Sequence, residues 1–208
     1  MIIRVDTDVL RSSGTKLSAL VDKIQVVQAR VKEISTKLNT VWDGGVSEDV
    51  LLSMNEQYEA MGLLAEKMTE AVVDVRNVAD SFEAADNSGG KGMAALTHLV
   101  TALKPLRPMR ILTEKWTGSL RIVPDEVISC GESYCGAGEE LEKIAAAYKE
   151  ILLALQESWE GNSYRNFVKA SDEITKHLNL LCEEIIALGR KTVQIAEVYR
   201  DIDAKIRF

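Results

Sequence analysis

Two stretches of this chain repeat each other without a gap at a constant shift of 117 residues, which brings Trp42 onto Trp159. The correspondence extends from Arg4 to Asp86 of the first stretch. Its most distinctive matches are Arg4 with Arg121, Asp8 with Asp125, Gly14 with Gly131, Gly44 with Gly161 and Phe82 with Tyr199. Because one shift aligns so long a stretch, we expect the chain to fold as two copies of one unit.

Each repeat begins with apolar residues whose spacing alternates between three and four positions. In the first repeat they are Leu10 and then, after one gap of seven, Leu17, Leu20, Ile24, Val27, Val31, Ile34, Leu38 and Val41. In the second they are Val127, Cys130, Tyr134, Ala137, Leu141, Ile144, Tyr148, Ile151 and Leu155. A second such seam follows in each repeat, from Met54 to Phe82 and from Ile174 to Tyr199. This spacing is typical of helices that pack on near-parallel neighbours, and it predicts helices of roughly 33–40 residues.

A Trp-X-Gly motif separates the two seams of each repeat. Its residues are Trp42 and Gly44 in the first repeat and Trp159 and Gly161 in the second. Gly accepts the positive φ that ends many helices, and Trp covers the end of a seam with a large apolar area. We therefore predict a helical hairpin in each repeat, with Ser47 and Ser163 as candidate N-caps of the second helices. The alternative to any further role is that the motif only makes the turn.

A single hairpin leaves one side of its seams in water, whereas two hairpins in one chain bury those sides against each other. The predicted fold is all-α: two long helical hairpins packed as an antiparallel four-helix bundle, with a partly helical connector. We assign the hairpins to residues 1–86 and 121–208 and the connector to residues 87–120. All 3 Pro of the chain lie from Pro105 to Pro124, so the flanks on both sides are free of the strongest helix breaker over long stretches.

The connector differs in composition from both hairpins. It opens with a glycine-rich break from Asn87 to Gly92, and Met93 to Leu103 has the pattern of a short amphipathic helix. Parallel hairpins would need only a few linking residues. A connector of about 34 residues, at up to ~3.3 Å each, instead suits hairpins that pack antiparallel.

Charge and hydropathy exclude several classes of function. A net charge of −7 and a pI near 5.0 argue against nucleic acid and against anionic membranes as partners. No run of 18 apolar residues is present, so we expect no stable membrane insertion. The N-terminal segment lacks a basic region followed by an apolar run, so we expect no signal peptide. The 3 Cys do not suggest a disulfide scaffold and fit folding in a reducing cytoplasm.

The sequence offers no constellation for catalysis, and we expect a non-enzymatic protein without cofactor or metal. His98 falls in the connector and His177 in the last predicted helix of the second repeat, and neither pairs with a nucleophile motif. Cys130 and Cys135 lack metal-site spacing, and packing explains Cys130 and Cys182.

Three glycines lie at the start of the third helix: Gly131, Gly136 and Gly138. They favour close helix approach, a kink or local fraying, and the sequence leaves these three alternatives open.

Near the end of the last seam stands Tyr199-X-X-X-Asp203, a pair that lies on one helix face. The long seams, the turn motifs and this pair together resemble the WXG100 family, also called the ESAT-6-like family. The resemblance covers residues 2–86 and 119–205 and makes the chain look like two such hairpins in tandem. It implies a substrate or helical partner of a type VII secretion system.

The resemblance also implies an export signal made of two hairpins. In the family, the Tyr-X-X-X-Asp/Glu pair of one hairpin lies near the Trp-X-Gly turn of its partner. Here Tyr199 and Asp203 match the pair, and Trp42 and Gly44 match the turn beside it.

The reciprocal copy of that signal is degenerate. It comprises Phe82, Asp86, Trp159 and Gly161, and Phe82 has no hydroxyl group. We therefore expect one working signal, the one at the end of the second repeat.

Two functions follow from the resemblance. In the first, the chain is the single-chain equivalent of an ESAT-6-like dimer: a monomer or weak homodimer, cytoplasmic before export and secreted without a signal peptide. In the second, it is a cytosolic adaptor or chaperone for a larger secreted toxin, which it binds through an exposed apolar strip or through Met93–Leu103. The chain shown ends soon after Asp203, and a short tail slightly favours the second function.

Overall fold

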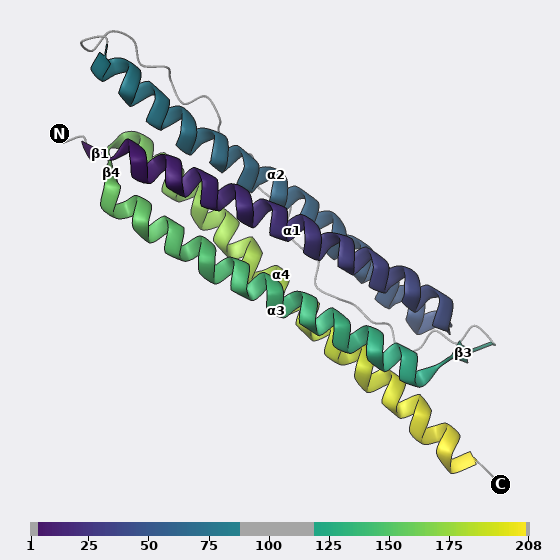
Figure 1. Ribbon diagram of the computed structural model, residues 1–208. Coiled ribbons are helices and arrows are strands. Elements are labelled where there is room, and N and C mark those ends of the chain that lie inside the picture. The colour runs from purple at the N-terminus through teal and green to yellow at the C-terminus, as the bar shows by residue number, and fades with distance from the viewer. Residues whose placement is uncertain (1–3, 88–118, 207–208) are drawn as a thin grey trace. The chain divides into compact units, whose positions relative to one another are not determined.

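The computed structural model describes residues 4–87 and 119–206 (Figure 1). Four long helices make up most of these residues: α1 (Thr7–Val41), α2 (Gly45–Asn87), α3 (Pro124–Ser158) and α4 (Asn162–Ile206). Four strands of two residues each stand at the helix ends: β1 (Arg4–Val5), β2 (Trp42–Asp43), β3 (Arg121–Ile122) and β4 (Trp159–Glu160). The predicted helix at Met93–Leu103 lies outside the described residues.

The chain forms two compact units, and each contains part of every helix. Unit 1 comprises Met1–Gln25, Leu63–Lys104 and Lys143–Leu178. Unit 2 comprises Val26–Gly62, Pro105–Glu142 and Asn179–Phe208.

The strand pairs define how the two hairpins are oriented. In unit 1, β1 pairs antiparallel with β4, so the first hairpin begins at the turn of the second. In unit 2, β2 pairs antiparallel with β3, so the second hairpin begins at the turn of the first. This confirms the predicted all-α fold, in which two long helical hairpins pack as an antiparallel four-helix bundle. The predicted domain boundaries after residue 86 and before residue 121 stay a prediction.

The core follows the predicted seams. All residues of the seams predicted for residues 10–41 and 127–155 are buried. The seams of α2 and α4 are buried in the same way except at a few positions, and they become half-buried at Phe82, Ile195 and Tyr199. Within the described residues, no helix contains a segment long and apolar enough to cross a membrane.

The glycines of α3 serve close packing against α4 in unit 2. A Cβ placed on Gly131 would lie 2.8 Å from the carbonyl oxygen of Gly189, and one on Gly138 would lie 2.5 Å from Ile186. α3 is continuous from Pro124 to Ser158, so these glycines do not break it. Of the three alternatives left open by the sequence, close approach applies to Gly131 and Gly138, whereas Gly136 faces the side chain of Arg30.

Candidate functional site

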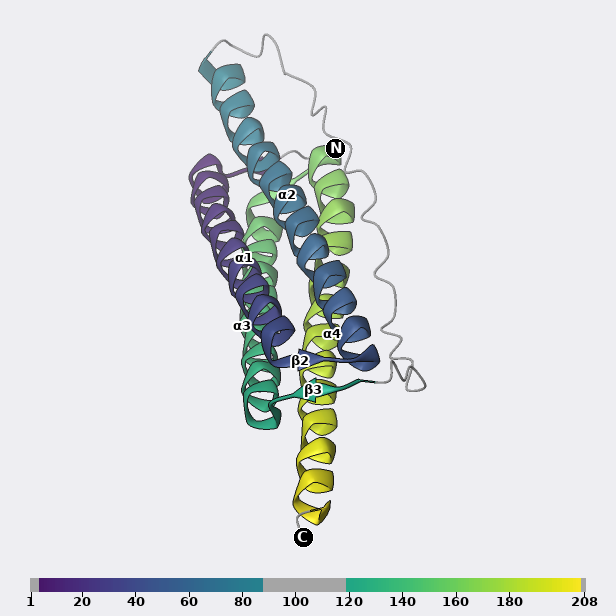
Figure 2. The ribbon, with the colours of Figure 1, turned by 90° about the vertical axis from the view of Figure 1, so that its right-hand side faces the viewer.

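The turn of the first hairpin is held by strand pairing in unit 2. Trp42 pairs with Ile122 and Asp43 with Arg121, and Figure 2 shows β2 and β3 side by side. The guanidinium of Arg121 donates to the carbonyl of Thr40 at 3.1 Å. We call this arrangement of β2, β3 and Arg121 the unit 2 clasp. It buries the Trp42 side chain to 1% exposure.

Unit 1 contains the equivalent clasp, made by β1, β4 and Arg4. Val5 pairs with Trp159, and the guanidinium of Arg4 donates to the carbonyl of Glu157 and lies 3.4 Å from a carboxylate oxygen of Glu160. Every one of these backbone contacts corresponds to one in unit 2 through the shift of 117 residues. The repeat aligns Arg4 with Arg121, but no motif in the sequence predicts which carbonyls they bind.

Both turn glycines have positive φ, as their motif predicts. The angle is 157° at Gly44 and 132° at Gly161, a region that side chains with a Cβ rarely adopt. A Cβ on Gly44 would lie 3.1 Å from Leu120, whereas one on Gly161 would have no neighbour within 4 Å. The first turn is therefore covered by the residue just before β3, and the second turn is open in the described part of the chain.

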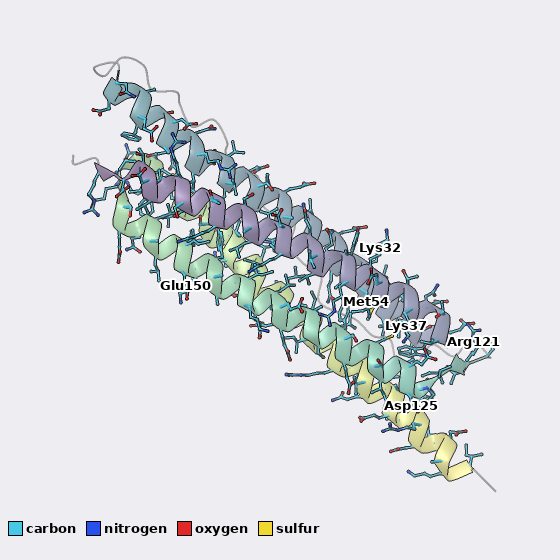
Figure 3. All side chains as sticks on the ribbon, in the orientation of Figure 1. Lys32, Lys37, Met54, Arg121, Asp125 and Glu150 are labelled. Carbon is cyan, nitrogen blue, oxygen red and sulfur yellow. The ribbon has the colours of Figure 1, made fainter. Side chains whose placement is uncertain are left out.

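Tyr199 and Asp203 lie in unit 2, the unit that also contains Trp42 and Gly44. Tyr199 is half-buried and Asp203 is exposed. Next to Tyr199, the guanidinium of Arg200 approaches a carboxylate oxygen of Asp125 at 3.5 Å. Figure 3 shows Asp125 and Arg121 at the start of the second hairpin. The contact of Arg200 thus ties the residue next to Tyr199 to the start of the second hairpin, whose strand β3 pairs with the first turn. The role of Tyr199 and Asp203 in recognition stays a prediction.

Phe82 and Asp86 lie in unit 1 together with Trp159 and Gly161. Phe82 is half-buried and Asp86 is exposed. The next residue, Glu83, accepts two hydrogen bonds from Arg11, at 2.6 and 3.1 Å. These bonds lower the pKa of the Glu83 carboxyl, and a second carboxylate, Asp80, lies 2.7 Å from the same guanidinium. α2 is thus tied to α1 beside the degenerate copy more closely than α4 is tied to α3 beside Tyr199.

The two turn tryptophans differ in one hydrogen bond. The indole N–H of Trp159 donates to the hydroxyl of Ser163 at 3.1 Å. The shift of 117 residues places Val46 at the position of Ser163, and the buried indole N–H of Trp42 has no hydrogen-bond partner in the part of the chain that the structure describes. Trp159 also packs against the rings of Tyr164 and Phe167.

The predicted caps of the second helices are wrong, because both helices begin earlier than expected. α2 begins at Gly45, so Ser47 lies inside its first turn and donates its hydroxyl to the Gly44 carbonyl at 2.7 Å. α4 begins at Asn162, so Ser163 lies inside the helix, and its hydroxyl accepts a hydrogen bond from the indole N–H of Trp159 instead of capping the helix.

The cysteines are free; Cys130 and Cys182 are buried and Cys135 is half-buried. Burial raises the pKa of the Cys182 thiol to about 12 and also raises the pKa of Cys130 and Cys135. The described residues contain no group of three or more His, Cys, Asp or Glu side chains placed to hold a metal ion.

An open hollow of about 520 Å³ lies beside the unit 1 clasp. Its lining residues are Arg4, Val5, Asp6, Thr7, Glu157 and Ser158. Arg4 is engaged in the clasp, and the Asp6 carboxylate accepts the backbone N–H of Val9 at 3.1 Å as the cap of α1. The polar groups that line it are thus largely committed to the fold.

Comparison with known proteins gives one family match. Residues 119–204 match the family described as "WXG100: Proteins of 100 residues with WXG". This match covers the second hairpin and supports the WXG100 family, and no second match over the first hairpin accompanies it. Neither the curated proteins nor the solved structures gave a match to the chain.

Proposed function

We propose that this protein is a tandem WXG100-like protein that acts with a type VII secretion system as the single-chain equivalent of an ESAT-6-like dimer. It is cytoplasmic before export, leaves the cell folded and without a signal peptide, and catalyses no reaction. The family match over residues 119–204 supports this function, because WXG100 proteins are associated with that export route.

The observation that carries the proposal is the unit 2 clasp. It joins the turn at Trp42 to the start of α3, and the contact between Asp125 and Arg200 joins the start of α3 to the end of α4. A composite signal needs a turn from one hairpin and a tail pair from the other within one compact unit. That Trp42, Gly44, Tyr199 and Asp203 all belong to unit 2 supports such a signal.

The two repeats offer a matched test of the export signal. Tyr199→Ala and Asp203→Ala are expected to abolish export from a host with an active type VII system. Phe82→Ala and Asp86→Ala change the repeat-equivalent residues and should leave export near the wild-type level. The amount of protein in the culture supernatant is measured against the cell fraction, with circular dichroism as the check on folding. Export of the Tyr199 and Asp203 variants at the wild-type level would contradict the proposal.

The second candidate function is that of a cytosolic adaptor for a larger secreted toxin. Three exposed apolar residues follow one face of α4 at a spacing of four: Val198, Ile202 and Ile206, which are 57%, 46% and 60% exposed. Such spacing suits a helix that anchors in an apolar groove of a partner. Affinity purification from the native host separates the two functions: a stoichiometric toxin partner in the cytoplasm supports the adaptor, and a lone chain in the medium supports the exported protein.

A further inference from the structure

The two clasps are alike, but the contacts between hairpins elsewhere in the units are not. In unit 2, the hydroxyl of Tyr134 on α3 donates to the side-chain oxygen of Gln57 on α2 at 2.5 Å. Gln57 is 5% exposed and Tyr134 is 0% exposed. The shift of 117 residues assigns Leu17 and Ile174 to the corresponding positions of unit 1, and both are fully buried. One buried polar pair in unit 2 therefore corresponds to a buried hydrocarbon pair in unit 1.

This difference would make homotypic pairing unfavourable. If two copies of the first hairpin paired in the observed register, Gln57 of each would face Leu17 of the other. If two copies of the second hairpin paired, Tyr134 of each would face Ile174 of the other. Either assembly buries two polar groups without a partner, and each such group shifts a pairing equilibrium by roughly tenfold or more.

An ion pair between the hairpins acts in the same direction. Arg30 on α1 donates to the carboxylate of Glu140 on α3 at 2.8 Å in unit 2. The repeat-equivalent residues are Ala147 for Arg30 and Lys23 for Glu140. Two copies of the first hairpin would bring Arg30 against Lys23, which replaces an attraction by a repulsion. Two copies of the second would leave Glu140 against Ala147.

We propose that Gln57, Tyr134, Arg30 and Glu140 determine which hairpins pair. Through them the first hairpin selects the second and rejects a second copy of itself. The clasps cannot supply this selection, because Arg4 and Arg121 make equivalent contacts and every possible pair would contain one or the other. The selection is a property of the interface between hairpins and does not depend on the proposed function.

The test uses the folded full chain with a protease site introduced between residues 88 and 118. Cleavage after folding leaves the two hairpins as separate polypeptides of one complex. The cleaved protein is unfolded in urea and refolded, and native mass spectrometry then counts the mixed pairs and the two kinds of homotypic pair. The wild-type sequence is expected to return mixed pairs almost exclusively.

Two variants are designed to change which hairpins pair, one in the core and one at the surface. Gln57→Ile with Tyr134→Leu installs the residues of the equivalent positions and is expected to raise the homotypic fraction roughly tenfold or more. Lys23→Glu changes an exposed residue and is expected to raise only pairs of the first hairpin, because it offers Arg30 a carboxylate. Arg121→Ala is the control, which should lower overall stability without changing the distribution.

The outcomes decide the proposal even if the core variant refolds poorly. Homotypic pairs in refolded wild-type protein would overturn it. So would an unchanged distribution in Lys23→Glu, whose substitution at the surface leaves the core intact.

Discussion

At the residue scale, the repeats show which hydrogen bonds matter because each position has a counterpart. Trp159 has an acceptor in Ser163, and Trp42 has Val46 at the same place. Tyr134 donates to Gln57, whereas the buried hydroxyl of Tyr148 lies near Ser171 without a hydrogen bond of ordinary geometry among the described residues. A buried polar group stabilises the fold only when it is paired, so these residues should respond in opposite ways to substitution.

Tyr134→Phe is expected to destabilise the protein by about 1–3 kcal/mol, because it leaves the buried Gln57 oxygen without its donor. Tyr148→Phe is the matched change and is expected to be neutral or stabilising by up to about 1 kcal/mol. Urea denaturation followed by circular dichroism measures both. Equal losses in the two variants would show that the hydrogen bond to Gln57 contributes nothing.

Ser163→Ala is expected to cost about 1–2 kcal/mol, since it removes the acceptor of the Trp159 indole. Val46→Ser offers the indole N–H of Trp42 an equivalent acceptor. The stability gained from this hydrogen bond is expected to offset part of the stability lost with the apolar contacts of the valine side chain. The measurement is the midpoint of thermal unfolding for each variant. A stabilised Ser163→Ala protein would contradict the role assigned to this hydrogen bond.

At the element scale, α3 and α4 approach closely because glycines face each other. A Cβ on Gly131 would meet backbone of α4 at 2.8 Å, and one on Gly189 would meet the Gly131 carbonyl at 2.7 Å. The repeat-equivalent of Gly131 is Gly14, where the nearest atom belongs to the flexible side chain of Arg76 at 3.2 Å. The two hairpins therefore share a seam pattern but pack their helices at different closeness.

Gly131→Ala is expected to destabilise the protein by about 1–3 kcal/mol, because backbone must move to admit the methyl group. Gly14→Ala is the control and is expected to be neutral or stabilising by up to about 1 kcal/mol, since Arg76 can move and Ala favours helix. Chemical denaturation of the pair gives the comparison. A Gly131→Ala protein as stable as Gly14→Ala would show that the contact with α4 is not tight.

At the scale of the whole molecule, long periodic features could be predicted and short non-periodic ones could not. The seams at 10–41 and 127–155 recur every three or four residues, and burial follows them throughout. The strands are two residues long and pair with residues far away in the chain, so no local pattern marks Arg4–Val5 or Arg121–Ile122. The caps at Ser47 and Ser163 were misplaced because serines inside a first helical turn resemble serines before it.

The sequence predicts which residues belong to the candidate site but does not predict the polar contacts around them. Motif and repeat named Trp42 and Tyr199, and connector length favoured antiparallel hairpins, which put both residues in unit 2. The polar contacts that differ between repeats, such as the one between Tyr134 and Gln57, depend on which helix faces which. A seam pattern does not contain that information.

Alkaline pH is expected to destabilise the whole protein through its buried acids. Burial raises the pKa of the Cys182 thiol to about 12, while the unfolded chain releases that proton near pH 8.5. The unfolded state therefore binds fewer protons over this interval, and the free energy of unfolding falls as the pH rises from about 8.5 to about 12. Burial also raises the pKa of the Tyr134 and Tyr148 hydroxyls, which steepens the fall above about pH 10. Denaturation of wild type and Cys182→Ala across this range measures the share of the thiol, and a Cys182→Ala protein with the same slope would exclude it.

The antiparallel pairing of the two hairpins is tested most directly by engineered disulfides. Asp43→Cys with Arg121→Cys joins residues that face each other in the unit 2 clasp, and the pair is expected to oxidise within one chain, as shown by peptide mass mapping. Arg4→Cys with Arg121→Cys places thiols at the starts of both hairpins, which would meet only if the hairpins packed parallel. Efficient bonding of residues 43 and 121 without bonding of residues 4 and 121 supports the structure, and the reverse result would contradict it.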